Sequence, residues 1–135
     1  MLKETMTYVN FDGEEVTEDL YFNLNTVELH RANAKYGGNI EEEIKRIIAN
    51  DEAEKMVEIL EYIILTSYGV KSPDGKRFIK TKEDRENFEY SIAYAELFTS
   101  ILMSPQKAKS FAEGLFSSSD SRRKQFQGQL DTPIA

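Results

Sequence analysis

The sequence contains few of the residues on which most site chemistry depends. It has no cysteine and only one histidine, His30. Without cysteine, neither a disulfide framework nor a thiolate metal site can form. A single histidine in a short predicted helix is more typical of a surface or packing residue than of a catalytic or metal-binding one. We therefore expect no catalytic residue, no bound metal and no cofactor.

Long apolar runs are also missing. No stretch approaches the roughly 20 apolar residues that a membrane span needs, and the first residues form no apolar run of signal-peptide length. We therefore expect a soluble protein that is not exported and has no membrane partner.

Basic residues are outnumbered by acidic ones. The 24 acidic and 17 basic residues give a formal net charge of −7. Nucleic-acid binding needs a concentrated basic surface, so we do not expect nucleic acid as a partner. The basic cluster Arg122 to Lys124 is more typical of a solubilising or linker segment than of a binding site.

Motifs that indicate an enzyme are not found. The sequence has no Gly-rich phosphate loop, no serine nucleophile elbow and no pair of histidines at metal-binding spacing. Glu54, Glu58 and Glu61 could belong to a carboxylate-bridged metal bundle, but such sites use Glu-x-x-His pairs, which this chain lacks. A solvated face is the better interpretation, and we expect no enzymatic activity.

What the sequence does contain is helical periodicity, strongest from Ile40 to Tyr68. Apolar residues recur there at intervals of three and four, which places them on one face of a helix. Asn39 can cap the first turn, and three glutamates follow where negative charge suits the helix dipole. The apolar pattern thins around Asn50, where we expect a kink or a short break.

The N-terminal segment has the pattern of a β-hairpin. Between Thr5 and Leu24, aromatic and β-branched residues surround the pair Asp12-Gly13. Gly tolerates positive φ and Asp bonds to its own backbone, so this pair predicts the turn of an antiparallel hairpin. An isolated hairpin is marginally stable in water, so a helix, another strand or another subunit must cover one of its faces.

Capping signals mark two further helices. Asn25 with Glu28 predicts a capping box for a short helix that ends near Tyr36. Thr81 with Asp84 predicts the start of a second long helix. We expect this second long helix to end near residue 103.

Two proline-containing segments interrupt the helical pattern. Pro73-Asp74-Gly75 predicts a turn, which lies in either a small hairpin or an ordered loop. Ser104-Pro105 predicts the start of a last short helix, because proline is favoured at the first helical position.

Together these signals predict an α+β fold that is mostly α and forms one domain. An N-terminal β-hairpin over residues 1–24 precedes a small bundle of four to five helices over residues 25–116. The composition changes over residues 117–135, which contain too little apolar surface to offset the entropy of ordering, so we expect a flexible tail there.

The aromatic edge of the second long helix is the candidate partner-binding surface. Its apolar residues occupy more than one face, which indicates a helix that is buried centrally or shared with a partner. The candidate partner-binding residues are Tyr90, Tyr94, Phe98 and Ile101. Plain core packing is the alternative interpretation of the same four residues.

Three segments resemble the tail assembly chaperones of long-tailed bacteriophages with non-contractile tails. They are T-E-D-x-Y-F-N-L at Thr17 to Leu24, S-Y-G-x-K-S-x-D-G-x-R-F-I-K at Ser67 to Lys80, and A-Y-A-E-L-F at Ala93 to Phe98. The resemblance covers about residues 6 to 116. These are family sequence patterns rather than catalytic motifs, so their specificity lies in their combination.

The resemblance implies a chaperone of the host bacterial cytoplasm that is absent from the finished virion. Such a protein binds the helical tape measure protein and keeps it soluble while the tail tube polymerises. The resemblance also suggests that the chain self-associates into a homo-oligomer. Further partners that it suggests are the tail tube protein and a longer form of the chain made by ribosomal frameshifting. The alternative is a structural tail component, such as a tube or completion protein, that remains in the virion.

Overall fold

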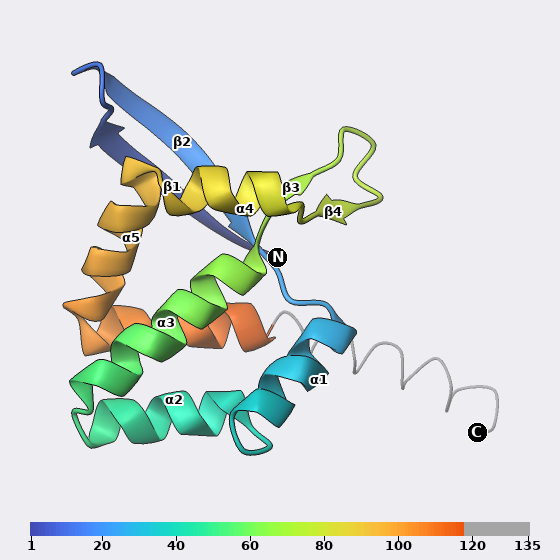
Figure 1. Cartoon of the computed structure of the whole chain (residues 1–135), viewed down its shortest axis with the longest axis vertical. Helices are drawn as coiled ribbons and strands as arrows, with labels where there is room; N and C mark the ends of the chain where they lie inside the picture. The colour runs from blue at the N-terminus through green and yellow to red at the C-terminus, as the bar shows by residue number, and fades with distance from the viewer. Residues whose placement is uncertain (118–135) are drawn as a thin grey trace.

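The computed structural model describes residues 1–117 of the chain. In chain order the elements are β1 (Leu2–Val9), β2 (Glu15–Phe22), α1 (Thr26–Lys35), α2 (Ile40–Ala49), α3 (Ala53–Ser67), β3 (Tyr68–Lys71), β4 (Phe78–Ile79), α4 (Lys82–Glu89) and α5 (Ile92–Leu102). A C-terminal helix over residues 105–117 follows α5. Figure 1 shows the β1–β2 hairpin extending from one end of the molecule, α1 and α2 at the other end, and α3 between them. This confirms the predicted α+β class.

The predicted N-terminal hairpin is confirmed. β1 and β2 pair antiparallel from Leu2 opposite Phe22 to Val9 opposite Glu15, and Gly13 has the positive φ of 82° that the turn requires. β2 also pairs with β3, and β3 with β4, which gives the sheet order β1-β2-β3-β4. α5 packs against β1. A helix and a third strand thus supply the cover that the hairpin needs.

The periodic segment from Ile40 to Tyr68 forms two helices with the expected break between them. The Asn39 side chain caps α2 by accepting a hydrogen bond from the Glu42 amide. α2 closes at Asn50, and Asp51 then adopts a φ of 53°. A short polar side chain tolerates this left-handed conformation better than a branched one, so the chain can turn sharply into α3.

The prediction of one long helix from Thr81 to Met103 is wrong, because the structure divides this segment into two helices, α4 and α5. α4 closes at Tyr90, and the Ser91 side chain then accepts a hydrogen bond from the Tyr94 amide as the cap of α5. Serine competes for backbone groups in this way and favours helix caps. The described chain therefore has six helices rather than four to five.

The other local predictions are confirmed. Asn25 and Glu28 form a reciprocal capping box at the start of α1, and the Thr81 side chain caps α4. The turn around Pro73-Asp74-Gly75 joins β3 to β4, so the segment is a small hairpin and not only an ordered loop. Apart from Ser117, which is helical, the predicted tail lies outside the described residues.

An aromatic cluster joins the sheet to the helices. Phe22 of β2 is completely buried and its ring meets those of Tyr68, Phe88 and Phe111 at centroid distances of 6.0, 6.0 and 5.4 Å. The edge-on geometry of these contacts is the favoured arrangement for aromatic pairs. Strand β3 passes close to β4 at Gly69, where a Cβ atom would lie 2.6 Å from the Phe78 ring. The core therefore contains residues from near both ends of the described chain, such as Phe22 and Phe111.

Candidate functional site

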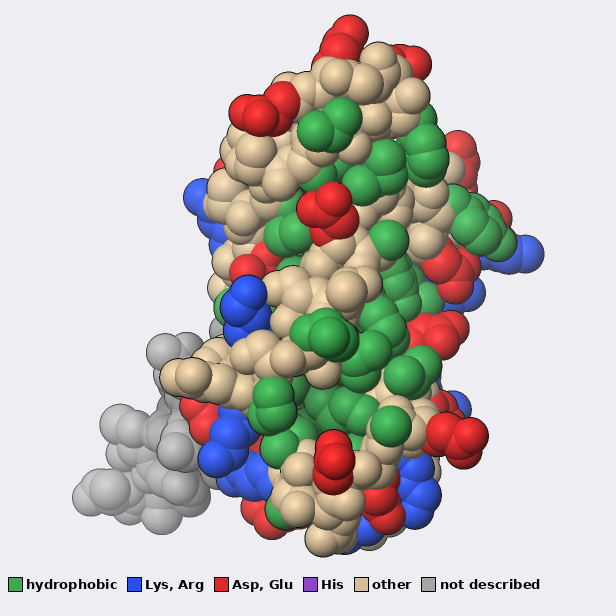
Figure 2. All heavy atoms as spheres, turned by 90° about the vertical axis from the view of Figure 1, so that its left-hand side faces the viewer, with side chains coloured by type: hydrophobic (Ala, Val, Ile, Leu, Met, Phe, Trp, Pro, Cys, Tyr) green, Lys and Arg blue, Asp and Glu red, His purple; other side chains and the backbone are tan. Residues whose placement is uncertain are grey.

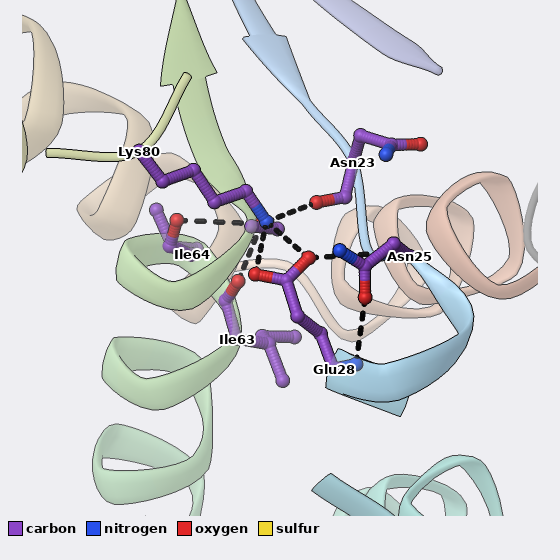
Figure 3. A network of polar contacts seen from close by, with 7 residues as sticks. Asn23, Asn25, Glu28, Ile63, Ile64 and Lys80 are labelled. Atoms are coloured by element: carbon purple, nitrogen blue, oxygen red, sulfur yellow. Dashed lines mark hydrogen bonds and ion pairs between the residues drawn. The ribbon is translucent and has the colours of Figure 1, made fainter. Parts of the chain in front are cut away.

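A partly buried ion pair is the most prominent polar feature, and its contacts are structural. Lys80 donates hydrogen bonds to both carboxylate oxygens of Glu28, at 2.7 and 2.8 Å, and to the carbonyl oxygen of Asn23 at 2.6 Å. Figure 3 shows the ammonium group pointing between these two partners. Glu28 also accepts from the Asn25 amide. The ion pair joins the start of α1 to the residue that follows β4. Nothing in this geometry indicates catalysis.

Among residues 1–117, no group of three or more histidine, cysteine, aspartate or glutamate side chains could hold a metal ion. His30 is exposed.

The structure separates the four candidate partner-binding residues. Tyr90, at the C-terminal cap of α4, is 75% exposed, whereas Tyr94 and Ile101 are 8% and 3% exposed and lie in the core. Phe98 is half-buried and stacks on Tyr94 at a centroid distance of 5.8 Å. Tyr90 and Phe98 are therefore the members of the set that offer substantial surface to a partner.

One face of the molecule carries a band of apolar side chains. Figure 2, which views the left-hand side of Figure 1, shows this band running from the hairpin past α5 towards the end at which α2 and α3 meet. Acidic and basic side chains lie along both of its edges. Soluble monomers rarely expose large continuous apolar patches, so a band of this kind indicates an interaction surface.

A groove of about 220 Å³ adjoins two helix junctions. We call it the apolar groove; it is lined by Ile47, Ile48, Asp51, Glu52, Ala53, Met56, Val57, Leu102, Pro105 and Ala108. Val57 is 40% exposed. Except for Asp51 and Glu52, the lining is apolar, so the groove can hold apolar side chains of a partner.

The two junctions explain why a groove forms here. The turn at Asp51 directs α3 away from α2, and the break at Ser104 directs the C-terminal helix away from α5. Ser104 accepts from the Lys107 amide, as the Ser-Pro signal predicts. Residues of both junctions line the groove, which therefore lies where the two changes of helix direction meet.

A second depression, the acidic cleft, has a volume of about 370 Å³ and lies among α1, α3 and α4. It is lined by Lys35, Tyr36, Glu58, Glu61, Tyr62, Leu65, Arg85, Glu86 and Glu89. Burial is the main cause of the raised pKa values of Tyr36 and Tyr62. Burial, followed by the charges of Glu61 and Glu89, raises the pKa of the neighbouring Tyr94 to about 12.

Neither depression is predictable from the sequence. The break near Asn50 and the Ser104-Pro105 signal were visible in the sequence, but nothing local shows that the two junctions meet in space. The acidic cleft joins residues of three helices, and the glutamates of α3 alone indicate only a solvated face.

The comparisons with known proteins decide the family. The family model of the phage tail assembly chaperone matches residues 1–119. The chain belongs to this family. No curated protein and no solved structure matches it. The resemblance seen in the sequence is thereby confirmed at the level of the family, and phage tail proteins are the general class of partner.

Two further findings concern enzyme class and membrane spans. The family is not a known class of enzyme. No helix within residues 1–117 is long and apolar enough to cross a membrane.

Proposed function

We propose that this chaperone binds the tape measure protein in the host bacterial cytoplasm and keeps it soluble while the tail tube polymerises. The protein then leaves and is not retained in the virion. The family match over residues 1–119 is the observation that supports this proposal most directly. On the same basis we propose that the chain self-associates. Further proposed partners are the tail tube protein and a longer frameshifted form of the chain.

The apolar band and the apolar groove supply a physical mechanism. A tape measure helix exposes an apolar stripe before the tube encloses it, and a groove lined by apolar side chains can cover such a stripe by helix-in-groove packing. Several copies bound along one client add avidity without tight individual contacts. Phe98 and Tyr90 extend the contact along the same molecule.

Co-expression tests the proposal. The chain is produced together with the tape measure protein encoded in the same phage genome, and size exclusion with light scattering measures whether the client becomes soluble and co-elutes at a defined stoichiometry. An insoluble client beside a folded chaperone contradicts the proposal for this form of the chain. Mass spectrometry of purified virions tests the alternative, because a structural tail component is present there and a chaperone is absent.

Val57→Asp tests the groove. A carboxylate at this position would have to be desolvated under a bound helix, so we expect the substitution to reduce client co-elution at least about tenfold. Val27→Asp is the matched control, because Val27 is also exposed, at 64%, but lies on α1 outside the groove. Equal co-elution of the two variants would place the client elsewhere on the chaperone.

A further inference from the structure

A third depression, the basic pocket, lies between the β3–β4 hairpin and the start of α1. Its volume is about 560 Å³, which exceeds that of the apolar groove and of the acidic cleft. The charged side chains that line it are Lys71, Lys76, Arg77, Lys80 and Glu28. Glu28 pairs with Lys80 at 2.7 Å. The other three cations are exposed and form no ion pair within residues 1–117.

Unpaired cations are unexpected on this chain, because its 24 acidic residues outnumber its 17 basic ones. Elsewhere on the surface, Lys45, Arg46 and Lys55 each pair with a nearby glutamate. The basic pocket instead gathers positive charge that the described chain does not neutralise. Like charges held close together repel one another, so a bound anion would relieve this repulsion.

Hydrogen bonds fix the turn that carries two of these cations. The Ser72 amide donates to the Arg77 carbonyl oxygen at 2.9 Å, and the Arg77 amide donates to the Ser72 hydroxyl at 3.0 Å. Asp74 accepts from the Ser72 hydroxyl at 2.6 Å and from the Lys76 amide at 3.0 Å, and it does not line the pocket. Figure 1 shows this hairpin projecting from the side of the molecule opposite α5. The backbone of the site is therefore preorganised, which lowers the entropic cost of binding.

The chemistry of the pocket fits a short acidic segment of a protein. Arginine can bind a carboxylate through two parallel N–H bonds, and lysine binds it as a point charge. The half-buried Phe78 also lines the pocket and can contact the apolar part of a peptide. A long polyanion such as nucleic acid fits less well, because the acidic remainder of the chain would repel the parts of it that lie outside the pocket.

We propose that the basic pocket binds glutamate or aspartate side chains of an acidic protein segment. The segment belongs to the client or to a second copy of this chain, since both sources offer the same carboxylate chemistry. This inference goes beyond the proposed function, because the pocket can bind an acidic segment whether or not the tape measure protein is the client.

Two synthetic peptides test the inference on the full chain. Both have about eight residues and a central leucine, and about four glutamates flank the leucine in one peptide and are replaced by glutamines in the other. Fluorescence anisotropy measures their dissociation constants. Three exposed ion pairs together predict about tenfold tighter binding of the glutamate peptide. This preference should shrink at about 0.5 M salt because salt screens exposed charges.

Charge-matched variants locate the effect. Lys71→Gln, Lys76→Gln and Arg77→Gln together remove three charges from the pocket, and we expect them to abolish the preference for glutamate. Lys45→Gln, Lys55→Gln and Lys109→Gln together remove three charges from exposed positions outside the pocket, and we expect them to preserve it. Circular dichroism checks that both variants are folded.

The same two variants identify the source of the acidic segment. Size exclusion with light scattering compares their oligomeric states, and co-expression compares their co-elution with the tape measure protein. A homo-oligomer that only the pocket variant loses assigns the segment to a second copy. Client co-elution that only the pocket variant loses assigns it to the client. If the pocket variant changes neither property, both sources are excluded and the inference is overturned.

Three binding results would also overturn the inference. Equal binding of the two peptides removes the requirement for carboxylates, and an equal loss of preference in both variants assigns it to net charge alone. An oligonucleotide of the same net charge that binds as tightly as the glutamate peptide makes the pocket a site for any polyanion. If the peptides show no preference but the tape measure protein still co-elutes, the inference fails and the proposed function stands.

Discussion

At the scale of single residues, regular spacing identified a shared helix face but not what that face contacts. Tyr94, Phe98 and Ile101 do follow one another along α5, yet Tyr94 and Ile101 point into the core. Tyr90 belongs to the end of α4, because the cap at Ser91 interrupts the helix between them. Burial depends on which other elements pack against a helix, and the spacing within one helix does not contain that information.

Tyr94 gives a prediction about alkaline pH. Its pKa is raised from 10 to about 12 in the folded chain, mainly by burial. Between these values the unfolded chain loses the tyrosine proton before the folded chain does, so the stability linked to Tyr94 is complete below pH 10 and declines towards pH 12. We expect Tyr94→Phe to remove about 1 to 2 kcal/mol of the loss in unfolding free energy over this range.

Urea unfolding near pH 9 and near pH 11.5 measures this difference. Tyr90→Phe is the matched control for the loss of a tyrosine hydroxyl, because Tyr90 is 75% exposed. An identical decline in the Tyr94→Phe variant and the original chain would show that other titrating groups cause all of it.

At the scale of elements, local signals predicted most boundaries. The caps at Asn25, Asn39 and Thr81 and the hairpin turn at Gly13 involve neighbours in the sequence, so their hydrogen bonds can be read from residue types alone. The division at Ser91 has a similar cap, but the apolar pattern continues through it. The pairing of β2 with β3 joins residues far apart in sequence, and no local signal predicts it.

The ion pair between Lys80 and Glu28 is another feature of this kind, because 52 positions separate its partners. Both side chains are mostly buried, at 20% and 17% exposure. Lys80→Met would leave the Glu28 carboxylate buried without its cation. We expect a loss of about 2 to 4 kcal/mol in the free energy of unfolding, because removing one partner of a buried pair leaves an uncompensated charge.

Urea denaturation at neutral pH measures the loss. Lys82→Met is the matched control, because Lys82 pairs with Glu86 at 3.8 Å and its side chain is 80% exposed. Exposed pairs contribute little, so we expect a change below about 0.5 kcal/mol. Equal effects of the two substitutions would mean that the Lys80 pair does not fasten α1 to the β4 segment.

At the scale of the whole molecule, the predicted assignment of the hairpin to the same domain as the helices can be tested through Phe22. This side chain belongs to the hairpin but contacts Tyr68 after α3, Phe88 of α4 and Phe111 of the C-terminal helix. The apolar band of Figure 2 also runs over both parts. If the two parts share one core, neither the band nor the groove can persist when the hairpin detaches.

Phe22→Ala should therefore destabilise the whole domain and not the hairpin alone. We expect a loss of about 3 to 5 kcal/mol, as for other buried phenylalanines, whereas Val9→Ala in the exposed part of the same hairpin should cost less than about 1 kcal/mol. Urea unfolding measures both losses. Because the Phe22 variant could be largely unfolded, native-state hydrogen exchange on the original chain provides a second readout: central amides of β1, β2 and α3 should exchange with the same free energy of opening. Hairpin amides that open far more easily than those of α3 would make the hairpin a separate unit, and client binding would then belong to the helices alone.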